Sequence, residues 1–370
     1  MIGASTCRRW AYVGCCCAVL TLIGCPQLLP DDFLVAVGGA GASGTTGLGS
    51  GGAAGDAGPG TAGAAGEQPD ASSGGRGEAG TGTCSDGARN QDETGVDCGG
   101  ACAACSCVFG PFQEVVQVEG LSADDRYGPA LSPDGQWLYL SAIPAGGTED
   151  LYRARRGASS VVLTDLEPLP NLNGTSLEGS PFLTRDGLTL FFFSDRTGGS
   201  GSRDLWLARR ASTSEEFANP APVPGVNSSD MDLLPRLSPD GLTLLFESTR
   251  AGASGSSDIW EAVRSSASGA FGAPRPRSDL NTAAREEGFT LSADQRTIIL
   301  SSSRGTGDLN LFVGTRSAAG ANFGALQPIA ELNSAEDDLD PFLSADGREI
   351  YFVSTRDGDY RIYHAQRDCL

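Results

Sequence analysis

The sequence predicts an all-β fold: a five-bladed β-propeller of four-stranded antiparallel blades, closed by an N-terminal strand. Three observations predict it. A turn aspartate recurs five times, at spacings of 52, 54, 54 and 52 residues. Each copy carries the signals of several short strands, and the last copy lacks a fourth strand while a spare strand precedes the first copy. A chain of 370 residues holds such a ring and a long N-terminal region besides.

The first two strands of each copy form a hairpin. Four of the turn aspartates begin an Asp-Gly turn, and Gln295 replaces the glycine in the fourth copy. Asp-Gly between two apolar runs is a β-hairpin signal. The runs after the turn, such as 188–193, are almost continuously apolar, which indicates strands covered on both faces by neighbouring blades. The five aspartates are Asp134, Asp186, Asp240, Asp294 and Asp346.

A third strand follows each hairpin with the pattern aromatic-x-small-x-Arg. A fourth is marked by Phe217, Phe271 and Phe323, each ahead of an extended segment that contains proline. Four short strands in about 53 residues match one propeller blade. The predicted third strands are 152–156, 206–210, 260–264, 312–316 and 363–367.

The two ends of the repeat region predict how the ring closes. The last copy ends after its third strand at Arg367, and the segment 112–118 has no blade of its own. We expect this segment to complete the last blade, which removes the sheet edges at the junction. The same arrangement places Cys107 beside Cys369 and predicts a disulfide, which would close a loop of about 260 residues.

The amino terminus has the features of an export signal. Arg8 and Arg9 precede an apolar stretch, 10–24, that is too short to span a bilayer. Residues 38–83 contain 18 glycines in 46 positions and cannot bury enough apolar surface to fold. The predicted organisation is therefore a signal peptide (1–24), a disordered tether (25–83), a cysteine-rich module (84–107) and the propeller (108–370).

The end of the apolar stretch, Leu22-Ile23-Gly24-Cys25, resembles the bacterial lipobox. The resemblance implies that Cys25 carries a diacylglyceryl group and becomes the first residue of the mature protein. An ordinary signal peptide with an incidental cysteine is the alternative, and Cys15 is an earlier candidate with a shorter apolar stretch. Because Pro26 rather than aspartate follows Cys25, the resemblance points to an outer-membrane lipoprotein, either periplasmic or exposed at the surface.

With Cys25 assigned to the lipid, six cysteines remain in the mature chain, an even number in an oxidising compartment, which favours disulfides. The segment 84–105 resembles a short cysteine module of exported proteins from myxobacteria-like organisms. A zinc knuckle is the alternative, but the segment has no histidine. The six are Cys84, Cys98, Cys102, Cys105, Cys107 and Cys369.

The motifs L-S-P-D-G, S-x-R and D-L-W/Y look like the TolB-type, WD-repeat-like propeller repeat, over the chain from Phe109 to its carboxyl end. TolB-type propellers act in envelope assemblies, and related repeats form the gating domain of prolyl-oligopeptidase-like peptidases. Neither role carries over directly, since no hydrolase domain and no TolB-like N-terminal domain is recognisable here.

Two charged positions repeat in four of the five copies. An acid stands eight positions before the turn aspartate and an arginine ten positions after it, whereas the first copy has Arg126 and Pro144. Hairpin pairing brings such positions together, so we predict structural ion pairs rather than a ring of cation-binding acids. The pairs are Glu178 with Arg196, Asp232 with Arg250, Glu286 with Arg304, and Asp338 with Arg356. An asparagine thirteen positions before the turn, absent from the first copy, is expected to make a local side-chain turn.

Other acids break the repeat and are candidates for an axial or loop site. Such acids could supply the carboxylate pair of a hydrolase of the five-bladed glycosidase kind, or a calcium site. His364, the single histidine, is expected at the surface or in packing rather than in catalysis. The candidate acids are Asp124, Asp125, Asp230, Asp337 and Asp340.

Composition narrows the function classes. All 26 basic residues are arginine and face 46 acidic residues, for a net charge of -20, which excludes a nucleic-acid reader. We therefore predict a monomer that touches the membrane only through its lipid and binds a protein, peptide or glycan partner. A glycan-active hydrolase is the alternative. No metal or cofactor is expected, apart from the possible calcium.

Overall fold

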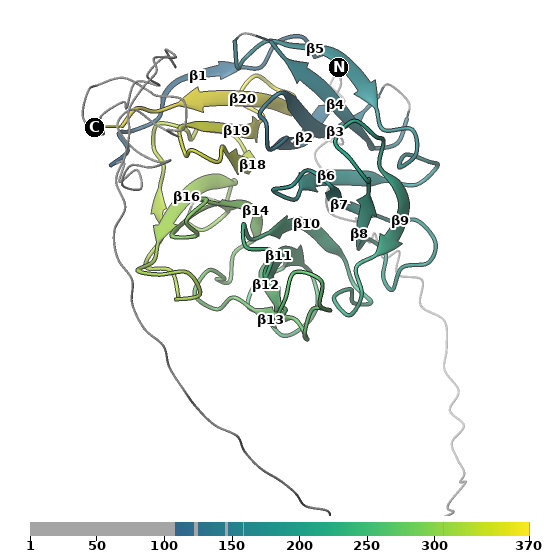
Figure 1. Cartoon of the computed structure of the whole chain (residues 1–370). Coiled ribbons are helices and arrows are strands. Elements are labelled where there is room, and N and C mark those ends of the chain that lie inside the picture. The colour runs from purple at the N-terminus through teal and green to yellow at the C-terminus, as the bar shows by residue number, and fades with distance from the viewer. Residues whose placement is uncertain (1–107, 122–124, 145–146, 158, 306, 370) are drawn as a thin grey trace, which may run out of the picture. The chain divides into compact units, whose positions relative to one another are not determined.

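The twenty strands of a computed structural model form five four-stranded antiparallel sheets arranged in a ring (Figure 1). The structure describes residues 108–121, 125–144, 147–157, 159–305 and 307–369, and this part of the chain has no helix. The predicted five-bladed propeller is confirmed. The predicted signal peptide, tether and cysteine-rich module lie outside the described residues.

Each blade runs from an inner strand at the axis to an outer strand at the rim. The first blade has the order β2 (Asp125–Leu131), β3 (Trp137–Ile143), β4 (Asp150–Arg156) and β5 (Leu163–Pro168). The third strands begin two residues before the aromatic residue that predicted them. The next blades contain β6 (Glu178–Leu183), β7 (Thr189–Ser194), β8 (Asp204–Arg209) and β9 (Ala218–Pro222); β10 (Asp232–Leu237), β11 (Thr243–Ser248), β12 (Asp258–Val263) and β13 (Arg275–Pro276); and β14 (Glu286–Leu291), β15 (Thr297–Ser302), β16 (Asn310–Thr315) and β17 (Gln327–Pro328).

The fifth blade closes the ring with both ends of the repeat region. Its strands lie in the order β18 (Asp338–Leu343), β19 (Glu349–Ser354), β20 (Arg361–Gln366) and β1 (Gln113–Gln117). The closing strand β1 is antiparallel to β20, with Gln117 opposite Tyr363. Beyond it, Phe109 forms an isolated bridge with Cys369. The predicted closure by the N-terminal strand is therefore confirmed.

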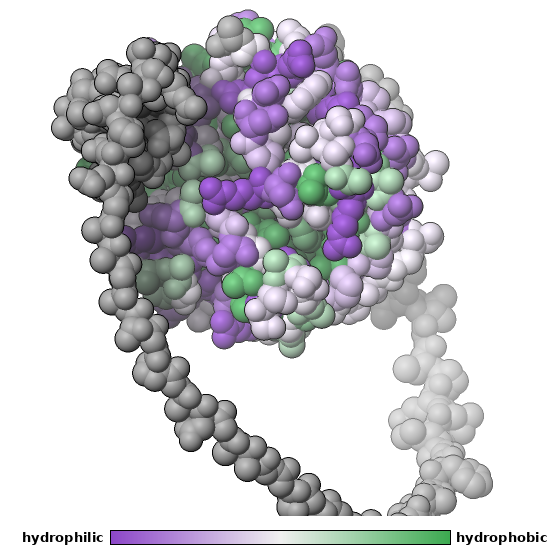
Figure 2. Space-filling view, viewed as in Figure 1, coloured by the Kyte–Doolittle hydropathy of each residue, from purple (hydrophilic) through white to green (hydrophobic). Residues whose placement is uncertain are grey.

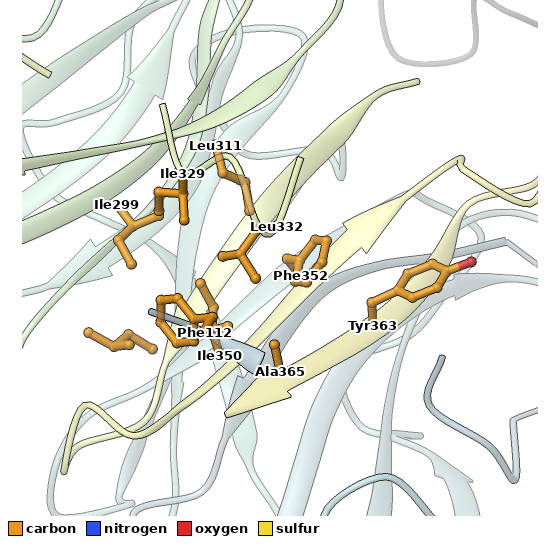
Figure 3. Packing of buried hydrophobic residues seen from close by; sticks show 10 residues of the cluster. Phe112, Ile299, Leu311, Ile329, Leu332, Ile350, Phe352, Tyr363 and Ala365 are labelled. Carbon is orange, nitrogen blue, oxygen red and sulfur yellow. The ribbon is translucent and has the colours of Figure 1, made fainter. Parts of the chain in front are cut away.

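The apolar core is divided among the spaces between blades. The middle strands are buried on both faces, as β7 shows with five buried residues in a row. At the junction of the fourth and fifth blades, Phe112 packs with Ile350 and Phe352 of β19 and with Ile299 of β15 (Figure 3). The residue just before the closing strand thus anchors that strand in the core.

The inner strands β2, β6, β10, β14 and β18 surround the axis, and each contacts the next around the ring (Figure 1). Each inner strand has a bulge where its pairing register shifts. The bulge holds the residue six positions before the turn aspartate, and four of these five residues have φ between 50 and 55°. The five are Gly128, Ser180, Leu234, Gly288 and Asp340.

Neighbouring inner strands approach one another closely at these bulges. A Cβ on Gly128 would lie 2.8 Å from the Cα of Ser180, and one on Gly288 would lie 2.7 Å from the Cα of Asp340. Real Cβ atoms do not approach a backbone so closely, so both positions require glycine.

Within the described ranges, no helix is long and apolar enough to cross a bilayer.

Candidate functional site: a buried polar cluster on the axis

The structure brings together all four repeated acid–arginine pairs. The carboxylates are fully buried, and each arginine also donates through Nη2 to a backbone carbonyl in the loop that precedes the inner strand. Burial raises the pKa of Glu178, while Ser194 and Arg196 lower it. These charges are satisfied within their own blade and serve the architecture. Their N–O distances are 3.0 Å (Glu178–Arg196), 2.5 Å (Asp232–Arg250), 3.1 Å (Glu286–Arg304) and 2.7 Å (Asp338–Arg356).

The repeated asparagines do not make local turns, which corrects the expectation from sequence. Asn227 accepts the N–H of Leu205 at 2.9 Å and donates to the carbonyl of Leu205 at 3.1 Å. The same pair of bonds joins Asn173 to Leu151, Asn281 to Ile259 and Asn333 to Leu311. Each asparagine therefore fastens the loop that leads into its own blade to the third strand of the preceding blade, 22 residues earlier.

The structure describes the side chains of three of the five candidate acids, and it does not bring these three together. Asp124 and the side chain of Asp125 lie outside the described part, although Asp125 begins β2. Asp230 is exposed in the loop before β10, and half-buried Asp337 accepts the N–H of Leu309 at 2.9 Å. Of the three acids whose side chains are described, only Asp340 reaches the axis, and it does so from the bulge of β18, not from a loop.

Asp340 lies in a polar environment that is almost closed to solvent. Its side chain is 1% exposed, and Oδ2 accepts the N–H of Gly128 at 3.1 Å. Arg236 on β10 is 3% exposed. Within the described residues, Oδ1 of Asp340 and the Nε and Nη2 atoms of Arg236 have no hydrogen-bond partner. Burial raises the pKa of Asp340 to about 6, against the opposing effects of Arg236 and Gly128. Burial likewise lowers the pKa of Arg236 to about 10.

Three buried glutamates lie near enough to Asp340 to interact with its charge. Glu149, just before β4, accepts a hydrogen bond of 2.6 Å from the hydroxyl of Ser141. Glu247 on β11 accepts one from the hydroxyl of Ser257, and its Oε2 has no partner in the described part of the chain. Glu287 on β14 forms an ion pair of 3.0 Å with Arg285. We call Glu149, Arg236, Glu247, Glu287 and Asp340 the axial cluster.

Burial is also the main cause of the altered pKa values of these glutamates. It raises the pKa of Glu149 and of Glu287 to about 7 each, and it raises the pKa of Glu247 well above its ordinary value. The negative charge of Asp340 contributes to the rise in all three. The pKa values of Asp340, Glu149 and Glu287 therefore lie near neutral pH.

Chemically, a carboxyl group whose pKa lies near 7 can serve as a general acid, and several together can serve as an acid and a base. The exposed fractions of the four acids are only 1–5%, so the cluster presents no open surface to a substrate. Among the described residues, no three His, Cys, Asp or Glu side chains are placed to hold a metal ion.

Sequence reasoning missed most of the axial cluster, although a signal for it was present. Seven positions after the turn aspartate, Glu247 stands where the other copies have serine, phenylalanine or valine. Seven positions before it, Glu287 stands where the others have tyrosine, glycine or leucine. A charge in a column of small and apolar residues is a sign of a local role.

A second polar cluster joins the first and fifth blades. Glu349 of β19 accepts hydrogen bonds from Arg156 at 3.0 Å and from the hydroxyl of Ser160. His364 of β20 is 4% exposed, and its Nε2 lies 3.3 Å from Glu349. Burial opposes ionisation of Glu349, but the bonds from His364 and Ser160 and the charge of Arg156 hold its pKa at about 2. This arrangement fastens a loop of the first blade to the last.

No protein-family model matches the chain, and no curated protein sequence matches it either. Among solved structures, it is similar to TolB from Acinetobacter baumannii (TM-score 0.43, 16% identity, 66% of this chain and 55% of that one). It is also similar to a putative TolB from Agrobacterium tumefaciens (0.43, 19%, 66% and 79%). A third is the catalytic domain of an α-L-arabinofuranosidase of glycoside hydrolase family 62 from Coprinopsis cinerea (0.48, 9%, 71% and 97%).

These similarities carry no argument about function, because the identities are low and the TM-scores lie below 0.5. The chain spans little more than half the length of the Acinetobacter TolB. The choice between a binding protein and a hydrolase therefore depends on the site itself.

Proposed function

We propose that this protein is a lipid-anchored envelope β-propeller without enzymatic activity, which binds a protein, peptide or glycan partner through the loops of one face. One observation carries the choice of binding over catalysis. The axial acids Glu149, Glu247, Glu287 and Asp340 are 4%, 4%, 5% and 1% exposed. A glycoside hydrolase places two carboxyl groups on either side of the bond that it cleaves, and carboxyl groups enclosed in this way do not reach that bond.

The surface supports a polar partner rather than a permanent oligomer. Only four large hydrophobic residues are exposed in the part of the chain that the structure describes: Val108, Val116, Val162 and Val263. Hydrophilic and apolar residues are mixed over the face seen in Figure 2, with no broad apolar area. Obligate interfaces are large and apolar, whereas transient partners and glycans meet mixed surfaces. This favours a monomer that binds its partner reversibly.

The sequence before the propeller supports the location. An apolar stretch that ends at Cys25 suits lipidation in the outer membrane, and the glycine-rich segment suits a tether. A flexible chain of that length has a mean reach of about 40–45 Å. Such a tether would let the propeller meet partners away from the membrane, in the periplasm or at the surface.

A hydrolase that acts on glycans is the second candidate, and the axial cluster is the observation that favours it. The carboxyl groups of three glutamates lie near that of Asp340, and two of the three have a pKa of about 7. If the axis opened when a glycan arrived, these groups would have suitable proton affinities for acid and base catalysis.

One experiment separates the two candidates. The purified chain is incubated with a panel of oligosaccharides and polysaccharides, and both bound glycan and newly released reducing ends are measured. In parallel, the chain with its tether is used to capture partners from detergent-solubilised envelopes, with a tether-only control. Binding without release supports the proposal. Release that disappears in Asp340→Asn would establish the hydrolase instead, and the absence of any bound protein, peptide or glycan would contradict the proposed function.

A further inference from the structure

A pocket of about 150 Å³ lies outside the axis, in the groove between the first and second blades. It is bounded by the β2–β3 turn and strands β3 and β4 of the first blade, and by the Asp-Gly turn and third-strand end of the second. Its lining includes Asp134, Trp137, Arg153, Asp186, Gly187 and Arg210.

Two residues make this groove different from the equivalent grooves elsewhere in the ring. Trp137 stands three positions after the turn aspartate, where the next three blades have threonine and the last has glutamate. Arg153 is the third-strand partner of Tyr139, and the equivalent partners are Leu207, Glu261, Val313 and His364. Since a site breaks repeat symmetry whereas architecture repeats it, this combination points to a local role.

The wall of the pocket is held in place before any ligand arrives. The Arg153 guanidinium lies 4.8 Å from the centre of the Trp137 ring. Arg153 also donates to Glu167 of its own blade and to Glu216 of the second blade, each at 3.0 Å. These bonds fix the guanidinium and, through stacking, the indole.

The floor of the pocket is open because Gly187 has no side chain. A Cβ there would lie 3.4 Å from Thr213 and 3.5 Å from Nη2 of Arg210. The turn aspartates Asp134 and Asp186 use only Oδ1 for their internal bonds. Among the described residues, their Oδ2 atoms and Nη2 of Arg210 have no hydrogen-bond partner, so both acceptors and a donor remain for a ligand.

The charges in this pocket select the class of ligand. Arg153 is already paired with Glu167 and Glu216, and Arg210 faces Asp134 and Asp186, so an anion gains no net electrostatic attraction in this pocket. An aromatic ring together with free donors and acceptors suits a molecule that has both apolar C–H faces and hydroxyl groups. A volume of 150 Å³ is below the roughly 300 Å³ of a typical drug-sized site, so the pocket suits a single ring.

We propose that the Trp137 pocket is a binding subsite for one sugar unit of a neutral glycan. The inference rests on the proposed function and selects the glycan among its possible partners. Trp137 and Arg153 provide the face on which the sugar ring packs, while Asp134, Asp186 and Arg210 bind its hydroxyl groups.

The test compares matched variants on an array that carries neutral oligosaccharides beside sialylated and sulfated ones. Trp137→Thr installs the residue found at this position in the next three blades, so the fold is expected to persist. Thr243→Ala, at the same position of the third blade, is the control. We expect wild-type chain to bind neutral glycans, and titration calorimetry with the best of them to show about tenfold weaker binding for Trp137→Thr. Thr243→Ala should bind like wild type, and circular dichroism should show all three folded.

Asp186→Asn is a second, independent test, because it keeps the turn geometry while it removes the charge of the acceptor Oδ2. We expect this variant to bind the neutral glycan severalfold more weakly. Equal binding by wild type and Trp137→Thr would overturn the site, as would a preference for charged glycans. Capture of a protein partner by a chain that binds no neutral glycan would overturn the sugar subsite and leave the proposed binding function intact.

Discussion

Four acidic side chains, each present in only one copy of the repeat, dominate the electrostatics at the residue scale. Glu149, Glu247, Glu287 and Asp340 lie near the axis with few partners. The repeated acids are equally buried, but each is bound by an arginine and by serine or backbone groups of its own blade. Burial without full pairing raises a carboxyl pKa, and such a shift links stability to pH.

We expect the protein to be more stable at pH 5 than at pH 8. Asp340, with a folded pKa of about 6, and Glu149 and Glu287, with values of about 7, bind protons more tightly when folded than when unfolded. Their stabilising contribution is therefore complete below the unfolded values near 4 and is lost as the pH rises through 6 to 7. The expected difference in the free energy of unfolding is a few kcal/mol, at about 1.4 kcal/mol per pKa unit and per group at most. Urea unfolding at the two pH values measures it.

Asp340→Asn is the matched variant for this pH dependence, because it mimics the protonated form at every pH and should reduce the difference. Glu349, with its pKa near 2, acts in the opposite sense: its contribution is present above about pH 4.3 and is lost as the pH falls toward 2. Stability should therefore be greatest between about pH 4 and 6. A free energy of unfolding that is the same at pH 5 and pH 8 would show that the axial acids are solvated.

Some of these side-chain contacts can be predicted from the sequence and others cannot. Both members of each repeated pair, such as Asp232 and Arg250, lie on one hairpin, so their spacing from a single turn brings them together. The axial cluster draws side chains from several blades, and its three members on inner strands, Arg236, Glu287 and Asp340, lie at or beside bulges that shift the pairing register. A period of two along the strand does not reveal those bulges. The sequence singles out Asp340 only because it is an acid that breaks the repeat, and it does not show which residues of other blades lie near it.

At the scale of strands and loops, the repeated asparagines fasten each loop between blades to the third strand of the preceding blade. One amide satisfies both the N–H and the carbonyl of a residue near the start of the third strand, as a neighbouring strand would. The position of this asparagine in the repeat was visible in the sequence. Its partner was not, because the bonds span 22 residues instead of a local turn.

Asn227→Ala is expected to lower the free energy of unfolding by about 1–3 kcal/mol, since it leaves the N–H and the carbonyl of Leu205 without their partner. Asn227→Asp should cost at least as much, because a carboxylate would then face the carbonyl oxygen. Chemical denaturation measures both, with the exposed Arg185→Ala as a control that should change stability by less than about 0.5 kcal/mol. A loss confined to Asn227→Ala would mean that only the bond from the N–H of Leu205 matters.

The close approach of the inner strands at their bulges should also affect stability. Gly128→Ala should be strongly destabilising, by about 2–4 kcal/mol, because the new Cβ would lie 2.8 Å from the Cα of Ser180 at a φ of 55°. Gly320→Ala is the matched control: its φ is 79°, but nothing lies within 4 Å, so it should cost only about 1 kcal/mol. Thermal and urea unfolding compare the two. Equal losses would show that the inner strands can separate enough to admit a methyl group.

At the scale of the whole molecule, stability depends on joining the first and last parts of the propeller. The strand β1 completes the fifth blade, Phe112 enters the core beside it, and Arg367 stacks at 4.1 Å over Phe109. The Glu349 cluster ties the fifth blade to the first on the other side of the junction. The sequence predicted this closure by counting strands, because a blade that lacks its outer strand can only be completed from the opposite end of the chain. The polar contacts of Glu349 could not be predicted, since they join residues about 190 positions apart.

The last prediction is a covalent seal at this junction, between Cys107 and Cys369. The backbone bridge from Phe109 to Cys369 brings the chain to within two residues of Cys107, and the Cys369 sulfur belongs to a disulfide whose partner lies outside the described residues. Cys369→Ser should lower the free energy of unfolding by about 2–5 kcal/mol, because the bond chiefly restricts the unfolded chain. Breaking the same bond by reduction of the wild type should cause a loss no larger than that of the substitution. Peptide mapping by mass spectrometry without reduction should recover a linked pair that contains Cys107 and Cys369. A link from Cys369 to Cys84, Cys98, Cys102 or Cys105 would contradict the pairing.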